Sequence, residues 1–126
     1  MIMLDTCALL WLASGGGKLS EAALEQIDSV PAVCISAISA FEISLKYRQG
    51  KLELPVLPDE WFRVVLEHHD ISVRSLDIDI CIAANDLPPV HKDPCDRLII
   101  ATAKLHNFPV VTGDSRFEEY DIEVIS

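Results

Sequence analysis

Short apolar segments of strand length alternate along this chain with longer segments of helical periodicity, and this alternation limits its fold more than any other feature. The expected strands occupy residues 1–4, 32–36, 71–76, 109–113 and 122–125. The expected helices occupy residues 6–14, 19–30, 39–51, 57–69, 77–87 and 93–107. Strands that alternate with helices form βαβ units, in which the strands are parallel and helices cover both faces of the sheet. The sequence therefore predicts an α/β fold with three layers, α/β/α, around a mostly parallel central sheet.

Length and charge narrow the class of protein further. The chain has 126 residues, which suits one domain with one core, and we expect residues 1–126 to form that domain. No apolar segment approaches the ~20 residues of a membrane-spanning helix, so we expect no membrane association. The N-terminal segment lacks a basic region before its apolar residues, which favours a cytoplasmic protein over a secreted one. The net charge of −10, taken alone, disfavours nucleic-acid binding because phosphates repel a negative surface.

The cysteines and histidines show no spacing typical of a metal site. The cysteines are Cys7, Cys34, Cys81 and Cys95, and none of them forms a C-x-x-C pair. A zinc site is therefore not expected, and small buried thiols in a reducing compartment are the preferred interpretation. The histidines are scattered, and we expect each to be solvent-exposed or structural. They are His68, His69, His91 and His106.

Four acidic residues fall where the expected strands end or the neighbouring helices begin. They are Asp5, Glu42, Asp96 and Asp114. In a parallel sheet the carboxyl ends of the strands share one edge, and ligands bind outside that edge. Connectivity places Asp5, Glu42 and Asp114 there, and Asp96 joins them if its helix also starts at this edge.

Each acid also has a structural interpretation, because acids are common at helix starts. Glu42 completes a Ser39-x-x-Glu42 capping box, and Asp5 can cap the helix that follows it. Asp96 lies in the first turn of a capped helix, where the dipole favours a negative charge by ~0.3–1 kcal/mol. Asp114 can open a turn. Taken one residue at a time, these interpretations remain open.

Together, the four acids indicate a cation site. Two unit charges 4 Å apart repel by ~4 kcal/mol at an effective dielectric constant of 20, so converging carboxylates need protons or a cation. Oxygen ligands without His or Cys select hard ions, Mg²⁺ or Mn²⁺. The waters of such an ion on an open edge can be displaced by phosphate oxygens or activated as nucleophiles. This set of residues points to phosphodiester hydrolysis.

Four ordered segments resemble the PIN-domain family, and most closely the VapC-type toxins of bacterial toxin–antitoxin pairs. The segments are MLDTCALLWL at 3–12, SAISAFEISLKYRQGKL at 36–52, HKDPCDRLIIATA at 91–103 and VVTGDSRFEEY at 110–120. The resemblance spans nearly the whole chain. It implies a compact α/β/α domain and a Mg²⁺- or Mn²⁺-dependent endoribonuclease that is the toxin of such a pair. One departure is Cys95, where many relatives have an aromatic residue.

The resemblance also implies which residues form the site. The family's acidic residues, as metal ligands and catalytic residues, map onto Asp5, Glu42, Asp96 and Asp114. Its hydroxyl residues map onto Thr6 and Thr112, and these two and Ser115 are candidates to hydrogen-bond the carboxylates. An ordinary β-strand threonine is an equal alternative for Thr112. On this interpretation Asp93 caps its helix and Asp96 faces the metal. We expect the positive end of the helix dipole to help keep Asp96 ionised.

Partners follow from the same resemblance. It implies a cognate antitoxin that binds the toxin and blocks its site, an RNA substrate and a homodimer. Arg97 and Arg116 adjoin the acidic motifs in sequence, so both are candidates to contact RNA phosphates or the antitoxin. An acidic toxin also suits a basic antitoxin segment.

Several other functions fit the same residues less well. A phosphotransfer receiver domain needs a paired acid after its first strand, where this chain has Thr6 and Cys7, and a haloacid-dehalogenase phosphatase needs an acid at position 7. A nuclease for structured DNA usually belongs to a larger domain. The main alternative is a non-catalytic α/β binding module whose acids are only helix caps. It predicts no stabilisation by Mn²⁺ and no effect of a single acid-to-amide change.

Overall fold

The computed structural model describes residues 1–126 and contains one five-stranded sheet. The strands are β1 (Ile2–Leu4), β2 (Val33–Ser36), β3 (Ile71–Arg74), β4 (Val110–Val111) and β5 (Val124–Ile125). Their order across the sheet is β3-β2-β1-β4-β5, and every neighbouring pair is parallel. The α/β class and the parallel sheet predicted from the sequence are therefore confirmed.

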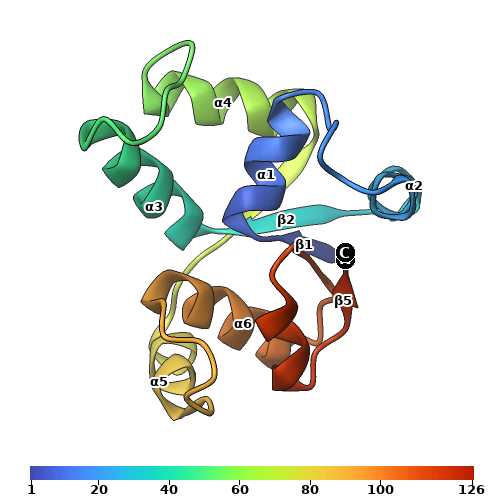
Figure 1. Ribbon diagram of the computed structural model, residues 1–126, viewed down its shortest axis with the longest axis vertical. Helices are drawn as coiled ribbons and strands as arrows, with labels where there is room; N and C mark the ends of the chain where they lie inside the picture. The colour runs from blue at the N-terminus through green and yellow to red at the C-terminus, as the bar shows by residue number, and fades with distance from the viewer.

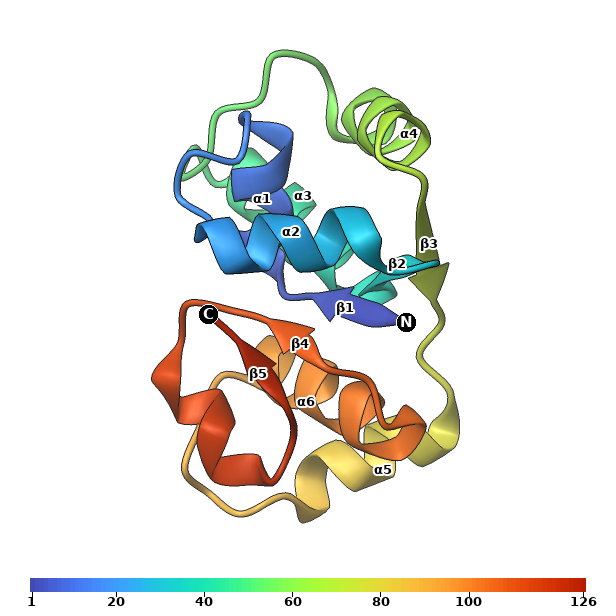
Figure 2. The ribbon, with the colours of Figure 1, turned by 90° about the vertical axis from the view of Figure 1, so that its right-hand side faces the viewer.

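Helices cover both faces of the sheet and complete the three layers (Figure 1). The α-helices are α1 (Thr6–Ala13), α2 (Glu21–Ser29), α3 (Ala37–Arg48), α4 (Pro58–His68), α5 (Ile78–Asp86) and α6 (Pro94–His106), and a 3₁₀ helix, η1, spans Ser115–Tyr120. Helices α1 to α4 lie on one side of the sheet, and α5, α6 and η1 lie on the other (Figure 2). No helix combines the length and apolar character that crossing a membrane requires.

Strand β1 shows how the sheet divides the core. Ile2 and Leu4 belong to the apolar cluster formed with α1 to α4, whereas Met3 between them belongs to the cluster formed with α5, α6 and η1. All three side chains are at most 2% exposed. Successive side chains of a strand point to opposite faces, so a sheet covered on both faces needs strands that are apolar throughout.

Capping residues fix the helix starts at the carboxyl edge of the sheet. Asp5 caps α1 and Asp93 caps α6, each accepting a hydrogen bond from a backbone N–H of the first turn. Helix α3 differs from the prediction, because its cap is Ser36 and Glu42 therefore lies in its second turn. The predicted capping box of Ser39 and Glu42 is wrong. Glu42 therefore does not cap a helix.

Candidate active site

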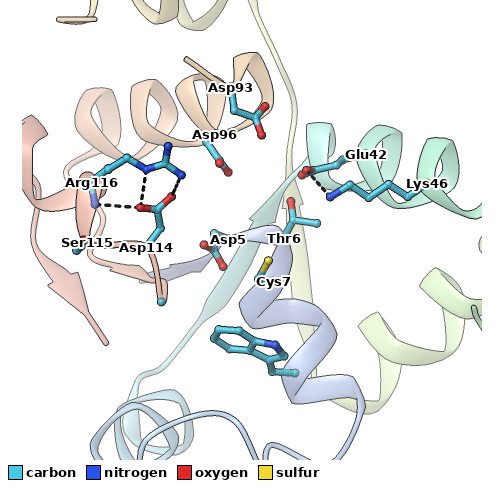
Figure 3. A pocket seen from close by; sticks show the side chains of 12 residues that line it. Asp5, Thr6, Cys7, Glu42, Lys46, Asp93, Asp96, Asp114, Ser115 and Arg116 are labelled. Carbon is cyan, nitrogen blue, oxygen red and sulfur yellow. Dashed lines mark hydrogen bonds and ion pairs between the residues drawn. The ribbon is translucent and has the colours of Figure 1, made fainter. Parts of the chain in front are cut away.

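The four acids converge on one cavity of about 520 Å³ at the carboxyl edge of the sheet (Figure 3). Asp5 comes from the junction of β1 and α1, Glu42 from α3, Asp96 from α6 and Asp114 from the segment between β4 and η1. They meet because parallel strands end at this edge and the adjoining helices begin there. The structure thus brings together all four acids that the sequence singled out.

Asp5 is buried and firmly held. It is 5% exposed, Oδ1 accepts from the Ala8 N–H at 2.8 Å, and Oδ2 accepts from the Thr112 hydroxyl at 2.5 Å. Burial raises the pKa of Asp5, while these two donors act to lower it. The Thr112 oxygen also accepts from the Asp114 N–H at 3.0 Å. Thr112 therefore connects the Asp5 carboxylate to the backbone of Asp114.

Asp114 is kept ionised by the guanidinium of Arg116. Asp114 Oδ1 accepts from Arg116 Nε at 3.0 Å, and Oδ2 accepts from Arg116 Nη2 at 2.8 Å. These hydrogen bonds hold the pKa of Asp114 well below its usual range. The Arg116 side chain is 56% exposed, so this pair lies at the mouth of the cavity.

His91 also belongs to the site, although the sequence interpretation left it out. It is 2% exposed, and Nε2 lies 2.9 Å from Asp114 Oδ2 and 3.0 Å from Asp96 Oδ2. Of the two expectations for the histidines, solvent-exposed or structural, exposure does not hold for His91. The one hint in the sequence was that His91 begins the segment HKDPCDR, which also contains Asp96. Its contact with Asp114 arises only from the tertiary fold and could not be predicted from the sequence.

Asp96, at the third position of α6, is the acid that ionises least readily. Its side chain is 20% exposed. Burial raises its pKa to about 7, and the nearby charges of Asp93, Glu42, Asp5 and Asp114 add to the rise. Burial and these like charges outweigh any help that the helix dipole gives to the ionised form.

Glu42 presents an oxygen that nothing in the protein satisfies. Oε2 pairs with Lys46 Nζ at 3.2 Å, whereas Oε1 is buried and accepts no hydrogen bond. Leaving a buried acceptor unpaired costs about 1–3 kcal/mol, and more for a charged group. Such an atom in a native fold needs an explanation, and a bound cation provides one.

The donor set fits a hard divalent cation. One ligand atom each of His91, Asp96 and Asp114 lies within 4.8 Å of the other two. Two unit charges at such a separation repel by roughly 3 kcal/mol or more at an effective dielectric constant of 20. Burial raises the pKa of Cys95 to about 11 and also raises that of Cys7, so neither offers a thiolate at neutral pH. Oxygen ligands without thiolates suit Mg²⁺ or Mn²⁺.

The other residues expected at the site take different places. Thr6 Oγ1 lies 2.9 Å from Ser39 Oγ, so the Thr6 hydroxyl pairs with a buried serine and hydrogen-bonds no carboxylate. Ser115 lines the cavity but hydrogen-bonds no acid. Arg97 differs most from its expected contact with RNA or antitoxin, because its guanidinium is used inside the fold. It donates to the backbone carbonyls of Ala84, Leu87, Pro88 and His91.

Comparison with known proteins identifies the family. The family model described as the PIN domain matches residues 2–123, and the chain belongs to the PIN domain family. A curated relative, Ribonuclease VapC22 of Mycobacterium tuberculosis, is 32% identical over 122 residues, which are 94% of this chain and 91% of the relative.

Solved structures share the fold over nearly their full length. A toxin–antitoxin complex from Klebsiella pneumoniae matches with a TM-score of 0.70 at 20% identity, covering 100% of this chain and 97% of that one. VapBC2 from Rickettsia felis, bound to a DNA fragment from its promoter, matches with a TM-score of 0.73 at 17% identity, covering 98% and 97%. These likenesses confirm the PIN-like fold.

Proposed function

We propose that this chain is a Mg²⁺- or Mn²⁺-dependent endoribonuclease and the toxin of a toxin–antitoxin pair. The observation that carries the proposal is the convergence of four carboxylates on one cavity, with Oε1 of Glu42 buried and unpaired. A relative at 32% identity is named a ribonuclease, and a solved structure of the same fold is a toxin–antitoxin complex. Both support this assignment.

The four acids are the proposed cation ligands, and the residues around them prepare them for that role. A divalent cation bound there would polarise a phosphodiester oxygen and supply an activated water. Thr112 and the Ala8 N–H orient Asp5, and Arg116 orients Asp114. Ligands that are already oriented need little reorganisation when the cation and the RNA bind.

We propose that Arg116 and Lys46 contact the RNA backbone on either side of the carboxylates. Both line the cavity, and they lie on opposite sides of the acids (Figure 3). Their side chains are 56% and 48% exposed, so a strand laid across the cavity reaches both. Local cations of this kind allow a chain with a net charge of −10 to bind phosphates.

The remaining partners are proposed on the same ground. A cognate antitoxin with a basic side chain would bind the acids of the cavity and compete with the cation, and Arg116 is a candidate to contact it. A homodimer and a single domain over residues 1–126 complete the proposal. The family model, which matches residues 2–123, supports the domain assignment.

The alternative of a non-catalytic module with capping acids explains only part of the site. Asp5 and Asp114 do cap α1 and η1. Glu42 lies in the second turn of α3 and caps nothing, yet it carries the unpaired buried oxygen. A cation site accounts for all four acids and for this oxygen, and we therefore favour it.

Cleavage of total cellular RNA by the purified chain with Mn²⁺ tests the proposal. The matched pair of variants is Asp96→Asn and Asp93→Asn, because Asp93 lines the same cavity but caps α6, a task that asparagine performs about as well. The wild type and Asp93→Asn should make discrete cuts in the RNA. Cleavage by Asp96→Asn should be weaker by about 100-fold or more, and EDTA should abolish all the cuts. Cuts that survive both treatments, or a wild type that neither cuts RNA nor is stabilised by Mn²⁺, would contradict it.

A further inference from the structure

His91 is the only buried histidine of the chain, and one of its nitrogens joins two acids from different segments. Nε2 is 2.9 Å from Asp114 Oδ2, before η1, and 3.0 Å from Asp96 Oδ2, on α6. Burial alone does not explain this arrangement, since a buried ring nitrogen is satisfied by one partner. The arrangement raises the question of which nitrogen carries the ring proton.

The surroundings of Nδ1 answer that question. The backbone N–H of Asp93 donates to His91 Nδ1 at 3.2 Å, so Nδ1 is an acceptor and carries no proton. The proton of a neutral imidazole is then on Nε2, the atom that faces Asp96 and Asp114. In this tautomer Nε2 has no lone pair to offer a metal. His91 Nε2 is therefore a donor to Asp114, and it lies within 3.0 Å of Asp96.

The backbone and the ring of His91 are held by Tyr120, Arg97 and Phe117. The His91 N–H donates to the Tyr120 hydroxyl at 2.6 Å, and that hydroxyl donates to the Pro88 carbonyl at 2.8 Å. The His91 carbonyl accepts from Arg97 Nη1 at 2.8 Å. Phe117 packs edge-on against the ring, with centres 5.8 Å apart. The hydrogen bonds fix the backbone of His91, and Phe117 restricts the rotation of its ring.

We propose that His91 is a positioning residue, which places a single Nε2–H between the carboxylates of Asp96 and Asp114 and so fixes their separation for a divalent cation. The inference rests on the proposed function, since it concerns the same carboxylates. A lysine or arginine here would bring a long, permanently charged side chain among the acids, whereas the imidazole of His91 places one ring N–H at a fixed point beside them. Arg116 holds Asp114 from the exposed side, and His91 still holds it when Arg116 turns to a phosphate.

Mn²⁺ affinity of the purified full chain, measured from the free Mn²⁺ resonance by electron paramagnetic resonance, tests this role. His91→Leu removes the donor, and His91→Gln retains an N–H near the position of Nε2. Val65→Ala serves as the stability control, because Val65 lies in the core on the opposite face of the sheet. If His91→Leu does not fold, His91→Asn replaces it, since the shorter amide does not reach the Nε2 position.

We expect His91→Leu to raise the Mn²⁺ dissociation constant by about 10- to 100-fold, and His91→Gln to stay within about threefold of the wild type. Val65→Ala should leave the constant unchanged despite its lower melting temperature. Equal Mn²⁺ binding by His91→Leu and Val65→Ala would overturn the inference and leave the proposed function standing. A wild type that binds no Mn²⁺ would instead refute the proposed function, and this inference with it. Nitrogen hyperfine coupling from an imidazole bonded to Mn²⁺ would show His91 to be a ligand and also overturn the inference.

Discussion

The two sides of the cavity are prepared in different ways. On one side lie Asp5, Asp96 and Asp114, here called the held acids. Each of them contacts a buried side chain that the fold keeps in place. Thr112 bonds Asp5 and the Asp114 backbone, and His91 contacts Asp114 and Asp96. On the other side Glu42 has one oxygen on the exposed Lys46 and one oxygen with no partner.

This difference indicates that the held acids are already oriented for a cation, whereas Glu42 becomes a ligand only when the cation binds. The held acids keep their places because Thr112 and His91 are buried and anchored in turn. Glu42 is tied only to a lysine that is 48% exposed, and such surface pairs contribute about 0.2–1 kcal/mol. We therefore expect a cation to bind the held acids first and to draw Glu42 away from Lys46.

The largest effect should come from loosening the held acids. Thr112→Val removes the donor to Asp5 and the acceptor for the Asp114 N–H, so we expect a loss of about 1–3 kcal/mol in the free energy of unfolding. The kcat/KM for RNA should fall by about 10- to 100-fold in Mn²⁺.

Thr102→Val is the matched control for this prediction. The Thr102 hydroxyl is buried in α6 and donates only to the Leu98 carbonyl, which belongs to the same helix. Its loss should leave kcat/KM near the wild-type value. Equal losses of activity in the two valine variants would mean that Thr112 acts on stability alone.

The order of these segments in the chain made much of the site predictable. Asp5 and Asp114 directly follow apolar strands, and parallel strands share one carboxyl edge, so their meeting follows from connectivity. His91 was not predictable in the same way, because its contact with Asp114 spans 23 residues and depends on how η1 packs against His91. The inward guanidinium of Arg97 also depends on tertiary packing, since it binds carbonyls of the α5–α6 connection.

The next largest effect should come from the ionisation of Asp96, one of the held acids. Because the pKa of Asp96 is about 7 in the fold and 3.8 in the unfolded chain, the folded state binds an extra proton between these values. Its stabilising contribution is present below about pH 4 and is lost as the pH rises through about 7. Without metal, wild type should therefore lose stability relative to Asp96→Asn between pH 4 and pH 8.

Chemical denaturation at several pH values in EDTA measures this difference. We expect Asp96→Asn to gain about 1–3 kcal/mol on the wild type between pH 4 and pH 8, less than the full pKa difference implies because solvent reaches part of the carboxylate. Mn²⁺ at pH 8 should reverse the order by stabilising only the wild type substantially. Parallel stability curves for the two proteins would show that Asp96 ionises normally.

The smallest effect should come from the Glu42 side. Lys46→Met removes an ion pair in which the lysine is 48% exposed and Glu42 is 13% exposed, so the free energy of unfolding should fall by about 1 kcal/mol or less. Mn²⁺ should bind about two- to threefold more tightly at low salt, because Glu42 no longer has a competing cation. Weaker Mn²⁺ binding by this variant would mean that Lys46 helps to place Glu42 and does not compete for it.

The Mn²⁺ dissociation constant of Glu42→Gln, measured beside the wild type by titration calorimetry at neutral pH, decides whether the unpaired oxygen belongs to a metal site. A cation held by all four acids predicts that this variant binds Mn²⁺ about 10-fold or more weakly, although its fold and the held acids are unchanged. Wild-type affinity in Glu42→Gln would contradict the account. Glu42 would then be no ligand, and the buried Oε1 would need another explanation.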